Sequence, residues 1–185
     1  AGAGARGAAN LAAIGEAGLD YHHDEGPRES QRELFAAQVD LAARLGLPAI
    51  VHSREAAEDS LAIVREASRR GTTVVMHCFG YGAAWARAFL DAGCYLSFAG
   101  NITYKTAGAL REACALVPID RLLFETDSPY MNPMPLRGRP SSPRDLERTV
   151  IAAAELRSQE VDELAQAVAA NALRLFGPTI ILRSP

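Results

Sequence analysis

Four residues with side chains that commonly bind metal ions stand at or just after the ends of short apolar segments. They are Glu16 after LAAIG, His52 after LPAIV, His77 after TVVM and Asp127 after RLLFET. Imidazoles and carboxylates are the usual ligands of the cations that activate water in hydrolytic sites. A single histidine at a strand end is more often a structural residue, but two histidines and two carboxylates in equivalent places are hard to attribute to chance. The pattern therefore indicates a metal-dependent hydrolase.

Strand-like and helix-like segments alternate along the chain between these residues. Continuous Val, Ile, Leu and Phe runs are typical of strands buried on both faces, and helices between such runs favour a parallel sheet. Helices are predicted over residues 30–45, 55–69, 83–92, 106–115, 143–156 and 159–175. Ser30 is expected to cap the first helix and Gly46 to end it. One face of this helix is expected to carry Leu34, Gln38, Leu41, Ala42 and Leu45.

About five parallel strands fit either an open doubly wound sheet or a closed barrel. An open sheet gathers its site at one crevice, whereas here four of the five strands offer a polar group at the same end, as the top face of a barrel does. The α/β fold predicted is therefore a TIM-type (β/α) barrel. A complete barrel has roughly 250 residues. The 185-residue chain is expected to form a partial barrel that lacks the first strands.

The composition of the chain indicates a single domain and argues against several other classes of protein. A hydrophobic content of 49% supports one sizeable core, so residues 1–185 are expected to form a single domain. The net charge of −3 argues against a broad basic surface, and any recognition of phosphate would be local. Three cysteines without CxxC spacing fit a reducing, cytoplasmic compartment and a role in core packing. No apolar run is long enough for a membrane span, and nothing points to an obligate protein partner.

Several motifs around these residues resemble the TatD family of metal-dependent hydrolases. The resemblance covers about residues 13–177 and is carried by AIGEAGLDY (13–21), the segment 31–55 with its IVHSR motif, VMHCFGYG (75–82), YLSFAGNITYK (95–105), LLFETDSPYMNPMPLRGRPSSP (122–143) and NALRLFG (171–177). The resemblance implies a TIM-barrel metallohydrolase that depends on divalent metal ions. It also implies deoxyribonuclease activity and, usually, a bacterial cytoplasmic setting.

The resemblance assigns a role to each of the four candidate ligands. Glu16 matches the metal-bridging glutamate of the family, and His52 and His77 match the histidines of its IVHSR and HCF motifs. Asp127 matches the aspartate of ETDSPY, a metal ligand that also activates the attacking water. Glu16 and Asp127 are therefore the candidate catalytic residues. The ligand set accepts Mg, Mn or Zn, and the complete family site is expected to hold two ions.

Other polar residues in these motifs are candidates for supporting roles. Glu125 either shares the face of Asp127 or is a buried supporting group, and Asp20 either orients a ligand or closes a turn. His22 and His23 are expected in a solvated loop rather than at a metal. Phosphate contacts are expected from basic residues beside strand ends or in the long loop, although a solvent-facing charge is equally expected for each: Arg54, Lys105, Arg137 and Arg139.

Two departures from the family pattern affect the predicted site. Family members open with a strand that bears an HxH pair of metal ligands, but this chain contains no HxH, and the adjacent His22 and His23 would point to opposite faces of a strand. In the loop, Ser141 stands where an asparagine is expected. The simplest interpretation is that the chain is truncated at its amino terminus. Such a fragment is expected to have unpaired strand edges, low stability and weak activity.

Three functional hypotheses follow from these observations. The first is a metal-dependent deoxyribonuclease that trims single-stranded DNA ends. The second is a related metallohydrolase that acts on another ester or amide, because one fold and one ligand set can serve several bonds. The third is a catalytically impaired, metal-binding fragment.

Overall fold

The structure is a computed structural model that describes residues 11–23 and 26–177. The chain divides into two compact units, of which one contains residues 1–75 and 172–185 and the other contains residues 76–171. The strands are neighbours in the order β1-β2-β3-β4-β5, and the division between the units falls within β3 (Val74–Met76). Five strands joined by helices confirm the predicted α/β fold.

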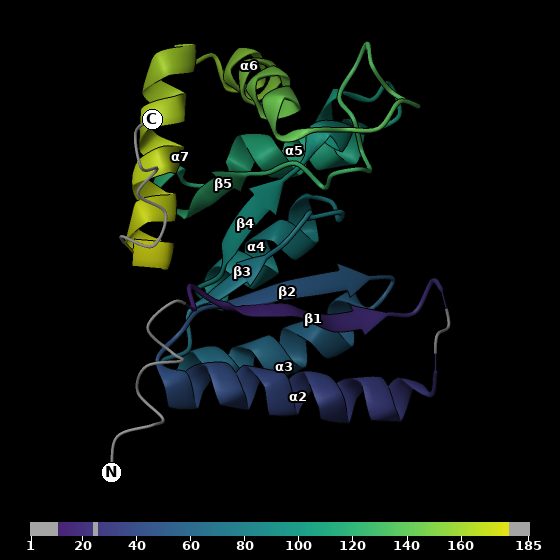
Figure 1. The fold of residues 1–185 in the computed structure, drawn as a ribbon, viewed down its shortest axis with the longest axis vertical. Helices are drawn as coiled ribbons and strands as arrows, with labels where there is room; N and C mark the ends of the chain where they lie inside the picture. Colours follow the sequence, from purple (N-terminus) through teal and green to yellow (C-terminus); the bar gives the residue numbers. More distant parts are fainter. Residues whose placement is uncertain (1–10, 24–25, 178–185) are drawn as a thin grey trace. The chain divides into compact units, whose positions relative to one another are not determined.

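The first unit is built on two parallel strands, β1 (Ile14–Asp20) and β2 (Ala49–Arg54). Helix α2 (Arg28–Leu45) packs against β1, and α3 (Ala57–Arg69) packs against β2. The two helices lie side by side against the same face of the strand pair (Figure 1). Alternate strand residues are buried, which leaves the intervening positions on the opposite face for polar side chains.

The pairing of β1 with β2 places Gly18 beside His52 and Asp20 beside Arg54. Ile14 pairs with Ala49 but Ala17 pairs with Val51, so β1 carries one extra residue between these two pairs. Gly18 has a φ of +151°, and a Cβ atom built there would lie 1.9 Å from the carbonyl oxygen of His52. Only glycine allows the two strands to approach this closely.

The face of α2 that carries Leu34, Gln38, Leu41, Ala42 and Leu45 is not the buried face of the helix, although Ala42 itself is buried. Leu34 is 62% exposed, while Phe35 and Val39 of the same helix are buried. Apolar residues surround this helix on more than one side, so helical periodicity fits two faces, and packing on the strands selects the face with the aromatic ring. The helix begins at Arg28, after Pro27, rather than at a Ser30 cap, whereas Gly46 ends it as predicted, with a φ of 65°.

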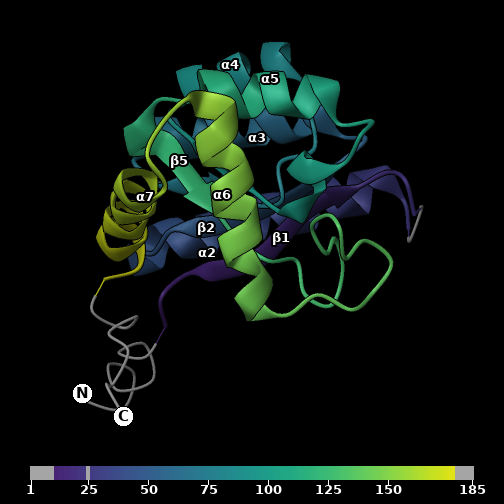
Figure 2. The same ribbon diagram turned by 90° about the horizontal axis from the view of Figure 1, so that it is seen from above.

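The second unit contains the parallel pair β4 (Tyr95–Phe98) and β5 (Leu122–Phe124). Its other elements are α4 (Ala83–Asp91), η1 (Gly100–Thr103), α5 (Gly108–Leu116), η2 (Ile119–Arg121), η3 (Pro143–Asp145), α6 (Leu146–Arg157) and most of α7 (Val161–Phe176). Helices α4 and α5 lie side by side, and α6 contacts α5 (Figure 2). Three buried rings form the centre of the core: Phe79 contacts Phe89 and Phe98 in edge-to-face geometry, with centroids 6.1 and 5.7 Å apart.

All six predicted helices are present, with ends within three residues of their predicted positions, but two strands end later than predicted. Strand β2 continues two residues past His52, to Arg54. Strand β1 continues to Asp20, so Glu16 is the third residue of a seven-residue strand rather than a residue at its end. The apolar run LAAIG ends early because the rest of the strand is polar on one face. None of the described helices combines the length and hydropathy that a membrane crossing requires.

The cysteines of the core are inert thiols. Cys94 and Cys114 are buried, and this burial raises the pKa of each to about 12. All three cysteines are free. The predicted packing role therefore fits Cys94 and Cys114, whereas Cys78 lies in the loop that follows β3.

Candidate metal centre

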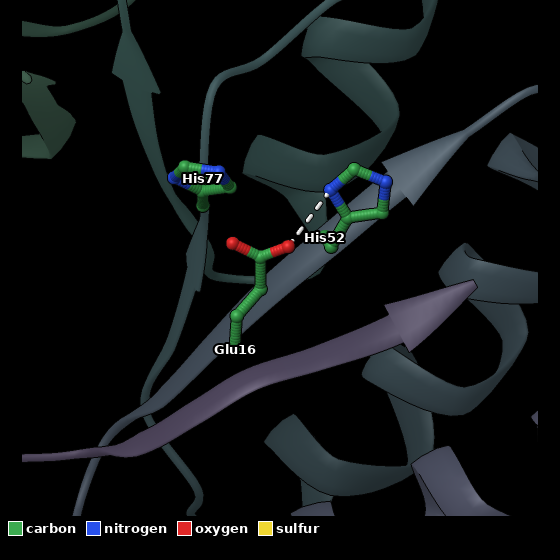
Figure 3. A group of neighbouring side chains, drawn as sticks. All are labelled: Glu16, His52 and His77. Atoms are coloured by element: carbon green, nitrogen blue, oxygen red, sulfur yellow. Dashed lines mark ion pairs between the residues drawn. The ribbon is translucent and has the colours of Figure 1, made fainter. Parts of the chain in front are cut away.

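In the first unit, His52 lies between two carboxylates of β1. Its Nδ1 is 3.1 Å from Oε1 of Glu16 and its Nε2 is 3.3 Å from Oδ2 of Asp20. Figure 3 shows the first of these contacts, with His52 projecting from β2. Glu16, Gly18 and Asp20 alternate along β1 and so share a face. Because Gly18 has no side chain, the imidazole fits between the two acidic side chains.

These residues line an open pocket of about 280 Å³. Its walls are the β1 residues 16, 17, 18 and 20, together with Gln31 and His52. The Glu16 side chain is 50% exposed and that of His52 is 30% exposed. A solvent-accessible carboxylate next to an imidazole is the donor chemistry that divalent cations use.

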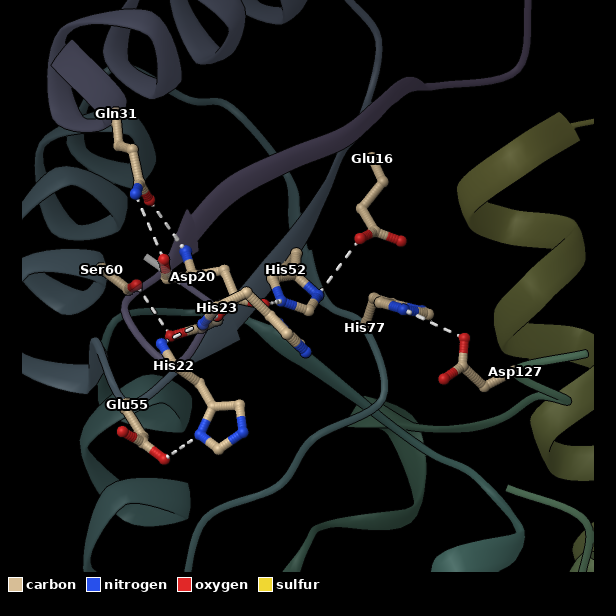
Figure 4. A network of polar contacts seen from close by, with 11 residues as sticks. Glu16, Asp20, His22, His23, Gln31, His52, Glu55, Ser60, His77 and Asp127 are labelled. Carbon is tan, nitrogen blue, oxygen red and sulfur yellow. Dashed lines mark hydrogen bonds and ion pairs between the residues drawn. The ribbon is translucent and has the colours of Figure 1, made fainter. Parts of the chain in front are cut away.

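Asp20 is a hydrogen-bonding centre at the end of β1. One carboxylate oxygen accepts from the backbone N–H groups of His22 and His23, and the other lies 2.7 Å from Nδ1 of His23 (Figure 4). Burial by itself raises the pKa of Asp20, but the hydrogen bonds from His23, His22 and His52 outweigh it and hold that pKa well below its ordinary value. Asp20 therefore makes both predicted contacts: it closes the turn and it holds a ring nitrogen of His52.

Gln31 fixes the backbone at the same point. Its Oε1 accepts from the N–H of Asp20 at 3.0 Å, and its Nε2 donates to the carbonyl oxygens of Asp20 and Gly26, each at 3.2 Å. This clamp joins the start of α2 to the end of β1. Sequence reasoning did not single out Gln31, because a glutamine in the first turns of a helix carries no distinguishing signal.

The histidine pair after β1 lies at the surface, as predicted. The side chains of His22 and His23 are 44% and 54% exposed. His22 Nδ1 is 2.7 Å from Oε1 of Glu55, so each ring of the pair has a carboxylate partner.

In the second unit, His77 also lies between two carboxylates. It follows β3 directly, and its Nδ1 is 2.5 Å from Oε1 of Glu125. Its Nε2 is 3.7 Å from Oδ1 of Asp127, the contact drawn beside His77 in Figure 4. Both acidic residues follow β5, and the side chains of His77 and Asp127 are 15% and 27% exposed. The unit thus brings together two of the four predicted ligands.

Glu125 lies among donors rather than beside open solvent. Besides His77, it accepts from the backbone N–H of Cys78 at 3.0 Å and from the hydroxyl of Ser97. Of the two predicted roles of Glu125, these contacts support the buried supporting group. Ser97 was not identified from the sequence. Apart from Tyr95, it is the only residue of the hydrophobic strand β4 that carries a hydroxyl group.

The long loop of residues 125–142 is held against η1 by several polar contacts. The N–H of Met134 donates to Thr103 Oγ1 at 2.8 Å, and the Tyr104 hydroxyl donates to the carbonyl of Asn132 at 3.1 Å. The guanidinium of Arg137 stacks over the Tyr104 ring, 4.4 Å from its centroid. Ser141, which replaces the expected asparagine, is buried, and its N–H donates to the carbonyl of Pro129.

The four predicted phosphate-binding residues are all exposed. Arg54 ends β2 in the first unit, whereas Lys105, Arg137 and Arg139 lie in the second. Arg111 donates to the carbonyl oxygens of Ile102 and Tyr104 and thereby supports the backbone before Lys105.

The motifs that contain these contacts match one family over nearly the whole chain. A sequence model of TatD-related DNases matches residues 6–177. The chain belongs to the TatD-related DNase family. The family match includes the candidate ligands of both units.

Relatives in the TatD family cover most of this chain. An uncharacterized metal-dependent hydrolase from Bacillus subtilis is 40% identical over 166 residues, which are 90% of this chain and 65% of the relative. One from Escherichia coli K12 is 41% identical over 90% of this chain and 63% of the relative. A protein of Erwinia amylovora named a 3'-5' ssDNA/RNA exonuclease is 40% identical over 90% of this chain. The chain therefore spans slightly less than two thirds of the first two relatives.

Solved structures of the TatD family share the fold. A TatD homolog from Escherichia coli K12 matches with a TM-score of 0.83 and 35% identity over 89% of this chain and 63% of that protein. A TatD family hydrolase from Entamoeba histolytica matches with a TM-score of 0.82 at 22% identity, which supports the fold alone.

Proposed function

We propose that this chain carries the ligands of a metal-dependent hydrolase that cleaves phosphodiester bonds of single-stranded DNA. The observation that carries the proposal is the repeated arrangement of a histidine between two carboxylates, once at His52 and once at His77. The motifs of both units lie within one family match, so we infer that they serve a single hydrolase domain over residues 1–185. Free cysteines are consistent with a cytoplasmic setting.

The donor set fits a divalent cation. Two imidazoles and two carboxylates, from Glu16, His52, His77 and Asp127, would hold it, and one or two Mg, Mn or Zn ions are compatible with these ligands. Glu16 and His52 lie on β1 and β2 of the first unit, whereas His77 and Asp127 follow β3 and β5 in the second unit. Such an ion would activate a water molecule and would neutralise charge on the phosphoryl oxygens.

The side chains of the protein supply the remaining steps of hydrolysis. Asp127 accepts the proton of the attacking water, because its partly exposed carboxylate can act as a general base. Asp20 keeps His52 in place through its 3.3 Å contact with Nε2. The substrate phosphates are bound by exposed cations, for which the candidates are Arg54, Lys105, Arg137 and Arg139.

Metal removal tests the proposal. We expect the purified chain to shorten a labelled single-stranded oligonucleotide in Mg²⁺ or Mn²⁺, and to lose this activity in excess EDTA and regain it on addition of metal. The name of the Erwinia relative suggests labelling both ends, to detect shortening from the 3' end. Metal-dependent cleavage of a chromogenic carboxylic ester or amide without nuclease activity would favour the second hypothesis. Metal binding without turnover of any substrate would favour the impaired fragment.

The proposed phosphate contacts of the second unit can be tested by the salt dependence of DNA binding. We expect Lys105→Gln and Arg137→Gln to raise KM for single-stranded DNA by about tenfold with kcat retained. Each lost phosphate contact should lower the slope of log affinity against log salt by about 0.7. Arg65→Gln, an exposed position of α3, is the matched control. Unchanged KM and salt slope in the Lys105 and Arg137 variants would remove them from the substrate path.

A further inference from the structure

We propose that Glu125 is a positioning residue for His77 and that Ser97 of β4 holds Glu125 in place. This inference rests on the proposed metal-dependent function, because its purpose is to present one nitrogen of His77 to a cation. It gives a role to β4, which supplies none of the candidate ligands. The Ser97 side chain of β4 would act on the His77 imidazole through Glu125.

The contacts of Glu125 account for both of its oxygens. Oε1 lies 2.5 Å from His77 Nδ1 and 3.0 Å from the backbone nitrogen of Cys78, and Oε2 accepts from the hydroxyl of Ser97. The side chain is 21% exposed, and Ser97 is 3% exposed. An ionised carboxylate only accepts hydrogen bonds, so its three neighbours must all donate. A hydrogen atom therefore resides on Nδ1 of His77.

The backbone after β3 is shaped for this arrangement. Cys78 has a φ of 42°, an uncommon value for a residue other than glycine. This turn lets the His77 side chain and the next backbone N–H reach the same oxygen of Glu125. The nearby strand supports the arrangement too, because the N–H of Glu125 donates to the carbonyl oxygen of Phe98, next to Ser97.

The chemical consequence concerns the other nitrogen of His77. With the hydrogen on Nδ1, the lone pair of the neutral ring is on Nε2, the atom that is 3.7 Å from Asp127. A ligand imidazole whose second nitrogen donates to a carboxylate keeps one orientation and becomes more basic. Glu125 and Ser97 would thus set which atom of His77 binds the cation, although neither would touch it.

The first test reads the tautomer in metal-free protein and requires no activity. In ¹⁵N-labelled chain, we expect the His77 ring to show a protonated Nδ1 and an unprotonated Nε2, with the signals assigned by their loss in His77→Gln. Glu125→Gln and Ser97→Ala should shift the ring toward a mixture of tautomers, and Glu125→Asp should recover part of the wild-type pattern. Glu147→Gln, on the exposed surface of α6, is the matched control. A wild-type Nε2–H tautomer would overturn the inference.

The second test measures Mn²⁺ affinity by calorimetry in the same variants. We expect Glu125→Gln to weaken binding by about 10- to 100-fold, with a smaller loss in Ser97→Ala and partial recovery in Glu125→Asp. Circular dichroism would check that each variant is folded. If the wild type binds Mn²⁺ and cleaves DNA while Glu125→Gln matches it in tautomer and affinity, the inference fails and the proposed function stands. If Glu125 controls the tautomer but the wild type binds no Mn²⁺, the proposed function fails and only the positioning of His77 is supported.

Discussion

Replacement of Asp127 by asparagine is expected to lower metal-dependent nuclease turnover by about 10²- to 10⁴-fold. Asparagine has nearly the same shape but cannot take a proton from water, and it is a weaker metal ligand than a carboxylate. The position is partly exposed, so the variant should fold. The measurement is kcat/KM on single-stranded DNA at saturating Mg²⁺ or Mn²⁺, with thermal unfolding recorded in parallel.

Asp120→Asn is the control for the Asp127 variant. Asp120 lies in the second unit and is 62% exposed, and its partner Arg121 is at the surface too. This change should leave turnover and thermal stability near wild type. Full nuclease activity in Asp127→Asn would assign the activation of water to another group.

Replacement of Gly18 by alanine is expected to destabilise the first unit by about 4 kcal/mol. The added Cβ would lie 1.9 Å from the carbonyl oxygen of His52 and 2.9 Å from its carbonyl carbon. Those atoms belong to the backbone of β2, so the strands must separate, and the pocket around His52 would be lost with their pairing. Chemical denaturation monitored by circular dichroism measures the change in the free energy of unfolding.

Gly26→Ala separates the steric clash from backbone strain. Gly26 has a φ of +149°, close to that of Gly18, but a Cβ there meets no atom within 4 Å. Gly26→Ala should therefore lower the free energy of unfolding only by the backbone strain, about 1 kcal/mol. Equal losses in both variants would show that backbone conformation, rather than the close approach of β1 to β2, governs the position of Gly18.

The elements of the fold were predictable because each leaves a local signal. Apolar runs marked four strands closely, and Gly46 marked the end of α2 as expected. The buried face of α2 could not be read from sequence, because Leu34 and Phe35 both satisfy helical periodicity and only packing distinguishes them. The end of β1 was missed for a related reason: its last residues alternate polar and apolar side chains after the apolar run ends.

The candidate ligands were predictable, but their supports were only partly so. His52 and His77 were found because histidine is rare in this chain and both follow apolar runs. Gln31 and Ser97 belong to common residue types, and their roles depend on contacts with residues distant in sequence, 11 and 28 positions away. Whether Glu125 was a ligand or a support could be decided only by its neighbours.

The extra residue of β1 limits how this segment can change in length. Glu16 lies within the register shift between Ile14 and Ala17, and Gly18 and Asp20 follow it at intervals of two residues, so the three share a face. Deletion or insertion of one residue between Glu16 and Asp20 would turn one of these carboxylates toward the helices. Deletion or insertion of two residues would keep both carboxylates on the same face of β1 and would change only the distance between them. Odd-length insertions and deletions in this segment should therefore be incompatible with a working site, even where single substitutions are accepted.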